Sequence, residues 1–212
     1  MKEYLLTVEF VEPLLGSIPL NSKEHAKFVE FSIQNNGELD QEDFEEEVDS
    51  LPEDSDKGLL GFYRDENGLF LFDYHVKGYL KEAANVVKDS EKVTGARSKV
   101  DNFVFVEPRR IYLGKKEPDG IITRPLRAIT PKGPRTRLVS SEYVSAGTQI
   151  ECRIVVINTN KVPEAFLRSC LDYGRYKGMG AWRNASFGRF TYSLVDAEAR
   201  KGTSLSRSAP RR

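Results

Sequence analysis

The sequence, 212 residues long, predicts an α+β fold with a ferredoxin-like, split βαβ core. Residues 149–157 have the composition and apolar pattern of a strand. Residues 74–88 and 164–176 carry apolar side chains at helical spacing. Without its insertions the chain reads strand, helix, strand, strand, helix, strand. This order defines the predicted core, and the open sheet face of such a core is a common platform for RNA.

The first half of the chain supplies one core strand, a hairpin and the first core helix. Pro13 ends the opening strand, and the pair Asn67-Gly68 predicts a tight hairpin turn. Asp73 stands where the N-cap of a helix is expected. Residues 24–33 fit either a short helix or a strand. The expected elements are the strands 4–12, 61–64 and 69–72 and the helix 74–88.

The second half supplies the other core elements and a longer hairpin. Pro108 separates two short strands, and Pro163 stands at the start of a helix. Residues 131–134, Pro-Lys-Gly-Pro, predict a turn that cannot continue a strand ladder. The expected elements are the strands 103–106, 110–113, 121–130, 137–144, 149–157 and 187–195 and the helix 164–176.

We expect residues 1–199 to form a single domain with two insertions. The first insertion, about residues 21–60, is acidic and is expected to contain a short surface helix followed by a flexible loop. The second, about residues 115–147, contains the arginine-bearing hairpin. The basic tail, residues 200–212, has no apolar pattern and is expected to be disordered.

The composition excludes several classes of protein. No apolar run approaches the roughly 18 residues of a membrane span, and the N-terminus lacks the apolar segment of a signal peptide. The only two cysteines, Cys152 and Cys170, cannot form a disulfide framework or a zinc cage. We therefore expect a cytoplasmic protein with no membrane contact, no cofactor and no bound metal.

Charge is balanced over the whole chain but is distributed unevenly along it. Lys and Arg number 32, as do Asp and Glu. Residues 1–106 hold 11 cationic and 23 anionic side chains, a net charge of −12, whereas residues 107–212 hold 21 and 9, a net charge of +12. Such asymmetry is typical of nucleic-acid contact through the basic half. It also fits two halves that attract each other.

The segment from Gly174 to Phe190 carries the most information about function. Its glycines permit positive φ angles and close approach of another backbone, and it also contains arginines, a lysine and a tryptophan. Free amides in a glycine turn beside guanidinium groups suit a phosphate backbone, and aromatic side chains can stack on bases. No Gly-Lys-Ser/Thr completes a phosphate-loop motif, which excludes a phosphate-loop NTPase. The alternative is a glycine turn packed between a helix and a strand.

Three segments together resemble the RAMP superfamily of CRISPR-associated proteins. Gly-x-Gly-x-x-Arg at residues 178–183 and Phe-Gly-Arg-Phe at residues 187–190 resemble its C-terminal glycine-rich loop. Residues 69–84 resemble its strand that enters a helix with a Lys-Gly start. The opening strand followed by Leu15-Gly16 resembles its first strand and the glycine after it.

The resemblance implies an RRM-like core that binds single-stranded RNA. Because residues 121–144 occupy the position of the family's thumb hairpin, it further implies a backbone subunit that binds guide RNA in a ribonucleoprotein complex of antiviral defence. Its partners would be RNA, other subunits and further copies of itself. The implied RNA-binding residues are Lys77, Lys81, Arg124, Arg127, Lys132, Arg135, Arg137, Lys177, Gly178, Gly180, Trp182, Arg183, Gly188 and Arg189.

Two departures from the family pattern bear on catalysis. The family's Ser-Ser-x-Lys-Gly is replaced by Tyr-His-Val-Lys-Gly at residues 74–78. No aspartate lies between Gly16 and Glu38, where members that cut target RNA place their catalytic acid. We therefore expect a protein that does not cut RNA.

Three alternatives remain open. The first is a metal-independent endoribonuclease in which His25 or His75 acts as general base, since histidine has a suitable pKa for that role. The second is a single-stranded DNA-binding protein of a phage or mobile element. The third is a structural module in which the acidic half of one copy contacts the basic half of the next.

Overall fold

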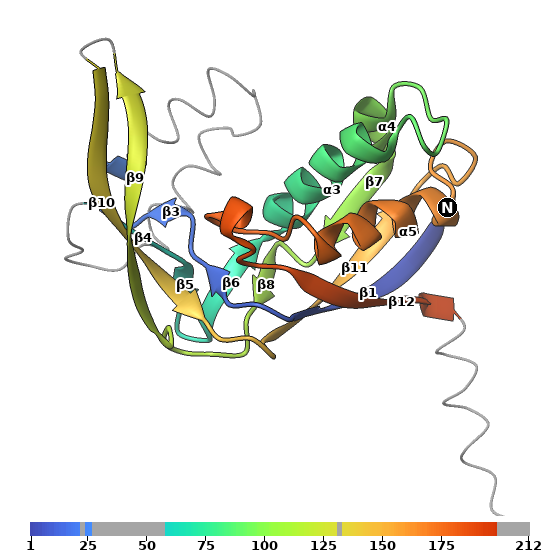
Figure 1. The fold of residues 1–212 in the computed structure, drawn as a ribbon. Coiled ribbons are helices and arrows are strands. Elements are labelled where there is room, and N and C mark those ends of the chain that lie inside the picture. The colour runs from blue at the N-terminus through green and yellow to red at the C-terminus, as the bar shows by residue number, and fades with distance from the viewer. Residues whose placement is uncertain (22–23, 27–57, 131–132, 199–212) are drawn as a thin grey trace, which may run out of the picture.

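A computed structural model describes residues 1–21, 24–26, 58–130 and 133–198 of the chain (Figure 1). The predicted acidic helix and loop and the predicted basic tail lie outside the described residues. Most of residues 24–33 and the first two residues of the predicted Pro-Lys-Gly-Pro turn also lie outside them.

A four-stranded antiparallel sheet with the order β12-β1-β11-β7 forms the core. Figure 1 shows helices α3 and α5 on the same side of this sheet. Along the chain the core elements run strand, helix, strand, strand, helix, strand, so the predicted α+β fold and its core order are confirmed. The six core elements are β1 (Lys2–Phe10), α3 (Asp73–Val87), β7 (Val104–Glu107), β11 (Gln149–Val156), α5 (Glu164–Asp172) and β12 (Phe190–Asp196). A further short helix, α4 (Ala96–Phe103), lies between α3 and β7 in the chain.

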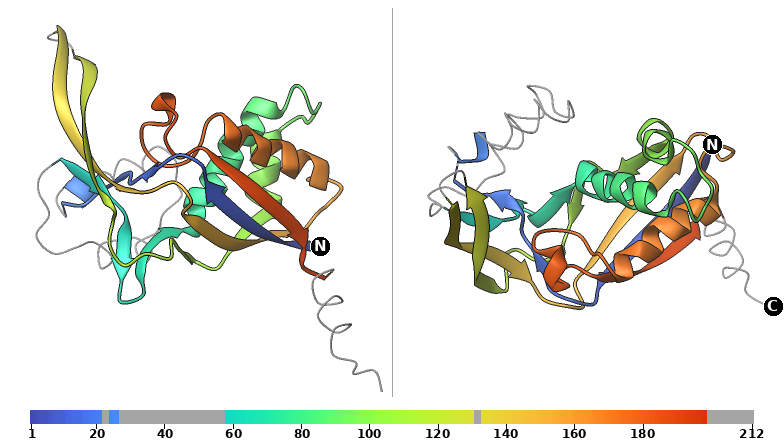
Figure 2. Two further views of the ribbon diagram at one scale, coloured as in Figure 1. Left: turned by 60° about the horizontal axis from the view of Figure 1, so that its bottom comes forward. Right: turned by 45° about the horizontal axis from the view of Figure 1, so that its top comes forward.

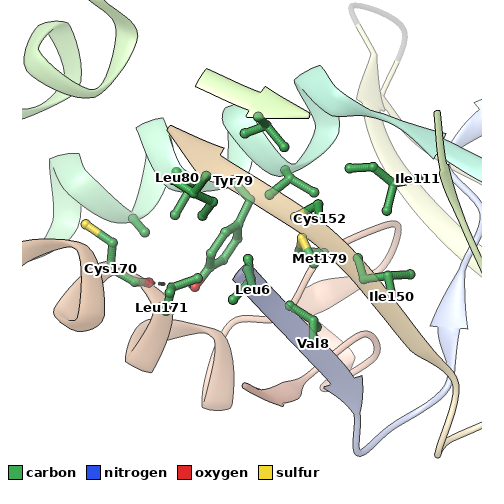
Figure 3. Close-up of a cluster of buried hydrophobic side chains, with 14 of the residues drawn as sticks. Leu6, Val8, Tyr79, Leu80, Ile111, Ile150, Cys152, Cys170, Leu171 and Met179 are labelled. Carbon is green, nitrogen blue, oxygen red and sulfur yellow. Dashed lines mark hydrogen bonds between the residues drawn. The ribbon is translucent and has the colours of Figure 1, made fainter. Parts of the chain in front are cut away.

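The hydrophobic core lies between the helices and one face of this sheet (Figure 3). Alternation along β1 buries Leu6 and Val8 against α3 and α5. The Tyr79 hydroxyl of α3 donates a hydrogen bond of 2.7 Å to the carbonyl oxygen of Cys170 on α5, which links the two helices. Burial raises the pKa of Cys152 and of Cys170 to about 12, so both thiols stay protonated at neutral pH. None of the helices in the described residues is long and apolar enough to cross a membrane.

Two further sheets, of five and three strands, adjoin the core sheet. One has the order β2-β10-β4-β3, with β9 paired to β10, and the other has the order β5-β6-β8. The hairpin of β9 and β10 projects from the body of the molecule in Figures 1 and 2. These strands are β2 (Leu14–Leu15), β3 (Ile18–Pro19), β4 (Leu59–Gly61), β5 (Tyr63–Asp65), β6 (Gly68–Phe72), β8 (Arg110–Tyr112), β9 (Gly120–Thr130) and β10 (Gly133–Val144).

One carboxylate ties together the two ends of the projecting hairpin. Asp119, just before β9, accepts a hydrogen bond of 2.6 Å from the amide of Ser145, just after β10, and also pairs with Lys115. The Lys115 ammonium and the Ser145 amide lower the pKa of Asp119 to about 2, because both favour the charged carboxylate. The base of the hairpin is therefore fixed by polar contacts as well as by the strand ladder.

The structure corrects four details of the predicted elements. Asp73 is the first helical residue of α3, and Phe72 is its N-cap. The helix predicted to reach residue 176 ends as an α-helix at Asp172 and continues as the 3₁₀ turn η1 (Tyr173–Arg175). Pro134 does not stop the ladder but pairs with Ile129 inside β10. The sequence reading missed α4, because eight residues show too short a periodic pattern.

Candidate nucleic-acid interface

The glycine-rich loop between α5 and β12 is anchored in the core by Met179, which is 5% exposed (Figure 3). Gly178 and Gly188 both have positive φ, +73° and +69°, and lie on either side of this anchor. Their amides are already used: Gly178 donates to the carbonyl of Gly174 at 3.2 Å, and Gly188 donates to that of Pro13 at 2.9 Å. The expectation that these two amides are free to bind phosphate is therefore wrong.

The glycines in this loop are required by contacts within the protein. A Cβ on Gly178 would lie 2.5 Å from the carbonyl carbon of Gly188. A Cβ on Gly180 would lie 2.5 Å from the carbonyl oxygen of Leu15. The backbone that approaches Gly180 is therefore that of β2, and not that of a bound nucleic acid. These contacts hold the loop as a fixed platform.

A stack of two aromatic rings and one guanidinium group connects this loop to the projecting hairpin. The ring centroids of Trp182 and Phe187 lie 5.3 Å apart, with their planes inclined by 15°. The Cζ atom of Arg124 on β9 lies 4.8 Å from the centroid of a Trp182 ring. Trp182 is 38% exposed. A nucleobase can extend such a stack, because every base has a π face.

The charge of Arg124 has no counter-ion among the described residues. Arg124 is only 6% exposed, and its Nη1 donates to the neutral hydroxyl of Ser141 at 3.0 Å. Its Nε is buried and has no hydrogen-bond partner within the described part of the chain. Burial alone lowers the pKa of Arg124, yet arginine stays protonated near neutral pH. A buried cation without a partner is costly, and an anionic ligand nearby would offset that cost.

The other predicted cations of the loop fall into two groups. Lys177 donates to the neutral Asn184 side chain at 3.1 Å, so its charge stays uncompensated in the described structure. Arg183 forms an ion pair of 2.6 Å with Glu82 of α3, and Arg189 forms one of 2.9 Å with Glu12. We therefore expect Lys177 and Arg124 to contribute more to anion binding than Arg183 and Arg189.

The two predicted lysines of α3 face α4 and β7 and do not line a groove with the glycine loop. Lys77 Nζ donates to the carbonyl oxygen of Asp101 at 2.7 Å and lies 4.7 Å from the ring centroid of Phe105. Lys81 is 7% exposed, and its Nζ lies 3.2 Å from Asp101 Oδ1. The resemblance implies that both lysines bind RNA together with the glycine loop, but in the structure both contact Asp101 of α4.

The register of the projecting hairpin places its predicted arginines on both faces. Position 124 pairs with 139, 126 with Arg137, and 128 with Arg135, so these pairs share one face. Arg127 pairs with Thr136 and belongs to the other face. Lys132 lies outside the described residues. The face that carries Arg124 therefore also carries positions 135 and 137.

Both histidines of the chain lie beside Tyr63, although they are fifty positions apart in sequence. The ring centroid of His25 and that of His75 each lie 6.0 Å from that of Tyr63. His25 is 0% exposed, and its Nε2 lies 3.2 Å from the Tyr63 hydroxyl. His75 is half-buried and stacks on Tyr74. His25 is therefore shielded from a ribose hydroxyl, which disfavours its use as the general base of an endoribonuclease.

The open face of the core sheet differs from that of a typical RNA platform. By strand register, Glu3, Glu9, Glu107 and Glu151 share this face with a single arginine, Arg153. Such a face repels a phosphate backbone. The loop and the hairpin, rather than this face, are therefore the candidate surface for a nucleic acid.

Sequence reasoning did not single out Phe187 as a stacking residue or Tyr176 as an exposed aromatic. Tyr176 is 79% exposed and directly precedes Lys177. The signal available in the sequence was that both aromatics lie within the same glycine-rich segment. In the described residues, no group of three or more His, Cys, Asp or Glu side chains could hold a metal ion.

The comparison with known proteins gives only structural similarity. No family model matches the sequence, and no curated protein matches it. A chain of a structure described as "Type IV-B CRISPR Complex" is 9% identical, with a TM-score of 0.48, and the match covers 99% of this chain and 95% of that one. A chain of "Cryo-EM structure of the Type III-B Cmr-beta bound to cognate target RNA" is 10% identical, with a TM-score of 0.47, over 92% of this chain and 62% of that one.

Proposed function

We propose that this protein binds single-stranded RNA as a non-catalytic backbone subunit of a CRISPR-type ribonucleoprotein complex. The observation that carries the proposal is the stack of Arg124, Trp182 and Phe187, in which a buried arginine without a described counter-ion lies against an exposed indole. Such a site combines an attraction for phosphate with a surface for a base.

The neighbouring side chains extend this site along the loop. Lys177 adds a second uncompensated cation, and the exposed ring of Tyr176 precedes it. Both belong to the segment whose residues resemble the RNA-binding loop of the RAMP superfamily. A strand of RNA would then cross the glycine loop, with bases on the aromatic rings and phosphates near the cations.

The projecting hairpin supports the backbone-subunit part of the proposal. By strand register, positions 135 and 137 belong to the same face of the hairpin as Arg124, and Arg124 contacts Trp182 of the glycine loop. A hairpin that extends beyond the body of the molecule is suited to reach a neighbouring RNA segment or subunit (Figure 2). Guide RNA and further subunits of one complex are therefore the partners that we propose.

Binding of a labelled single-stranded RNA, measured by fluorescence anisotropy at several salt concentrations, tests the proposal. We expect the affinity to fall with salt, with a log-log slope of roughly −0.7 for each phosphate contacted. Lys177→Met and Arg124→Met should each make the slope shallower by about 0.7, because each removes one cation from the site. Lys161→Met is the matched control, since Lys161 is exposed and lies outside the loop and hairpin.

Other results would change the assignment. Equal or tighter binding of single-stranded DNA would favour the DNA-binding alternative. Cleavage of the labelled RNA by the pure protein would favour the endoribonuclease. An affinity independent of salt, or a Lys161→Met variant that loses as much as Lys177→Met, would contradict the proposed site.

A further inference from the structure

The open face of the core sheet carries negative charge that no described residue neutralises. Glu9 accepts a hydrogen bond from the neutral amide of Gln149 at 2.9 Å, and Glu151 accepts one from the Thr7 hydroxyl at 3.3 Å. The other two carboxylates, those of Glu3 and Glu107, share one cation. The guanidinium group of Arg153 lies 3.4 Å from Glu3 and 3.8 Å from Glu107, and it is the only cation among the described residues of this face. The four glutamates and one arginine leave a net charge of −3.

Apolar side chains lie among these carboxylates. The register places Leu5 opposite Arg153 on one side and opposite Val195 on the other, and Val195 is 41% exposed. A depression of about 530 Å³ lies on this face, and Leu5, Glu107, Pro108, Glu151, Cys152 and Arg153 line it. The face therefore offers a hollow for an apolar side chain with acidic groups beside it.

A complementary segment follows the edge strand of the same sheet. Residues 200–212 contain five cations (Arg200, Lys201, Arg207, Arg211 and Arg212), a leucine and no acidic residue, a net charge of +5. They begin four positions after β12 ends at Asp196, and Asp196 pairs with Tyr4 of β1. The basic segment thus starts at the edge of the acidic face.

The segment is long enough to cross that face. Glu151 lies on β11, two strands from β12, and pairs with Thr7, three residues along β1 from Tyr4. Two strand spacings of about 4.8 Å and three residues of about 3.4 Å give a separation of about 14 Å. Ala197 and Glu198 are helical and advance the chain by about 1.5 Å each. Three further residues gain up to about 3.3 Å each, so Lys201 reaches up to about 13 Å from Asp196, and its long side chain covers the remaining distance.

We propose that the acidic open face of the core sheet is a docking surface for the chain's own basic segment, residues 200–212. Opposite charges give the attraction, and Leu205 is the apolar group available for the depression. Covalent connection keeps the effective concentration of the segment high, so weak individual contacts suffice. This contact lies on a different surface from the proposed RNA site.

Carbodiimide crosslinking of the full-length protein tests this proposal, because the reagent joins a lysine to a carboxylate in direct contact. Lys201 is the only lysine in the segment. We expect crosslinks from Lys201 to Glu3 or Glu151, mapped by mass spectrometry after proteolysis. The double variant Glu9→Lys/Glu151→Lys should lower the yield of crosslinks to Glu3 by about fivefold or more, since two favourable contacts become repulsive.

Glu66→Lys/Asp89→Lys is the matched control, because both carboxylates are exposed and neither lies on the core sheet; it should leave the yield unchanged. Raising the salt concentration should lower the yield of crosslinks for the wild type.

An equal mixture of ¹⁴N- and ¹⁵N-labelled protein shows whether the segment that occupies the face comes from the same copy or from another one. Crosslinks within one copy support the proposal, whereas crosslinks between copies would assign the face to a second copy instead. Absence of the crosslinks at low salt would overturn the proposal.

Discussion

Trp182→Ala lowers the affinity for single-stranded RNA by about fivefold to 150-fold, because stacking of one base on an aromatic ring contributes about 1–3 kcal/mol. The variant removes the central ring of the stack, so Phe187 loses its aromatic partner and Arg124 loses its cation–π contact. Fluorescence anisotropy with a labelled RNA measures the effect. Circular dichroism verifies that the fold is retained.

Phe105→Ala is the matched control for this loss. Phe105 is 44% exposed and also has a cation over its ring, that of Lys77 at 4.7 Å, but it lies on β7 at the edge of the core sheet. We expect it to keep the affinity of the wild type, and Trp182→Phe to keep most of it. If Phe105→Ala loses the affinity and Trp182→Ala does not, the RNA site has been assigned to the wrong surface.

Gly188→Ala lowers the free energy of unfolding by about 2–5 kcal/mol. Its φ of +69° costs an alanine about 1–2 kcal/mol. The added Cβ would in addition collide with the carbonyl oxygen of Met179, and overpacking of this kind costs about 1–3 kcal/mol. Urea unfolding followed by far-ultraviolet circular dichroism measures the loss.

Gly147→Ala separates the two contributions. Gly147 has a φ of +85°, and an added Cβ would have no neighbour within 4 Å. This variant should therefore lose only the backbone contribution of about 1–2 kcal/mol. Equal losses in the two variants would show that the glycine loop yields to the added methyl group, and that Met179 does not hold it as a fixed platform.

Periodic apolar patterns made the core predictable from sequence. The alternation of β1 and of β11 and the helical spacing of α3 and α5 repeat over enough residues to show which face is buried. The β5–β6 hairpin and the projecting hairpin were predictable for a related reason, because turn residues separate two runs of strand-forming residues. The predicted position of the first turn was wrong by one residue, since Glu66 and Asn67 form it and Gly68 already pairs with Asp65 in β6. The short helix α4 and the two-residue strands β2 and β3 carry no such repeat, and tertiary contacts define them.

The candidate site was predictable in its residue types but not in its contacts. The sequence does not distinguish a glycine that leaves its amide free to bind phosphate from a glycine that lets two backbones pack closely. In the structure, Gly178 and Gly188 allow close backbone packing. Whether a cation is neutralised also depends on distant partners. Arg183 forms an ion pair with Glu82 of α3, whereas Arg124 lies against the ring of Trp182 and contacts no carboxylate among the described residues.

The intrinsic fluorescence of Trp182 during titration with unlabelled single-stranded RNA tests the central claim most directly, because Trp182 is the only tryptophan in the chain. The proposed site predicts a saturable change in its emission over the same RNA concentrations at which anisotropy reports binding, and a weaker change at higher salt. If anisotropy reports binding while the emission of Trp182 stays constant, RNA binds elsewhere, and the stack of Arg124, Trp182 and Phe187 is not the RNA site.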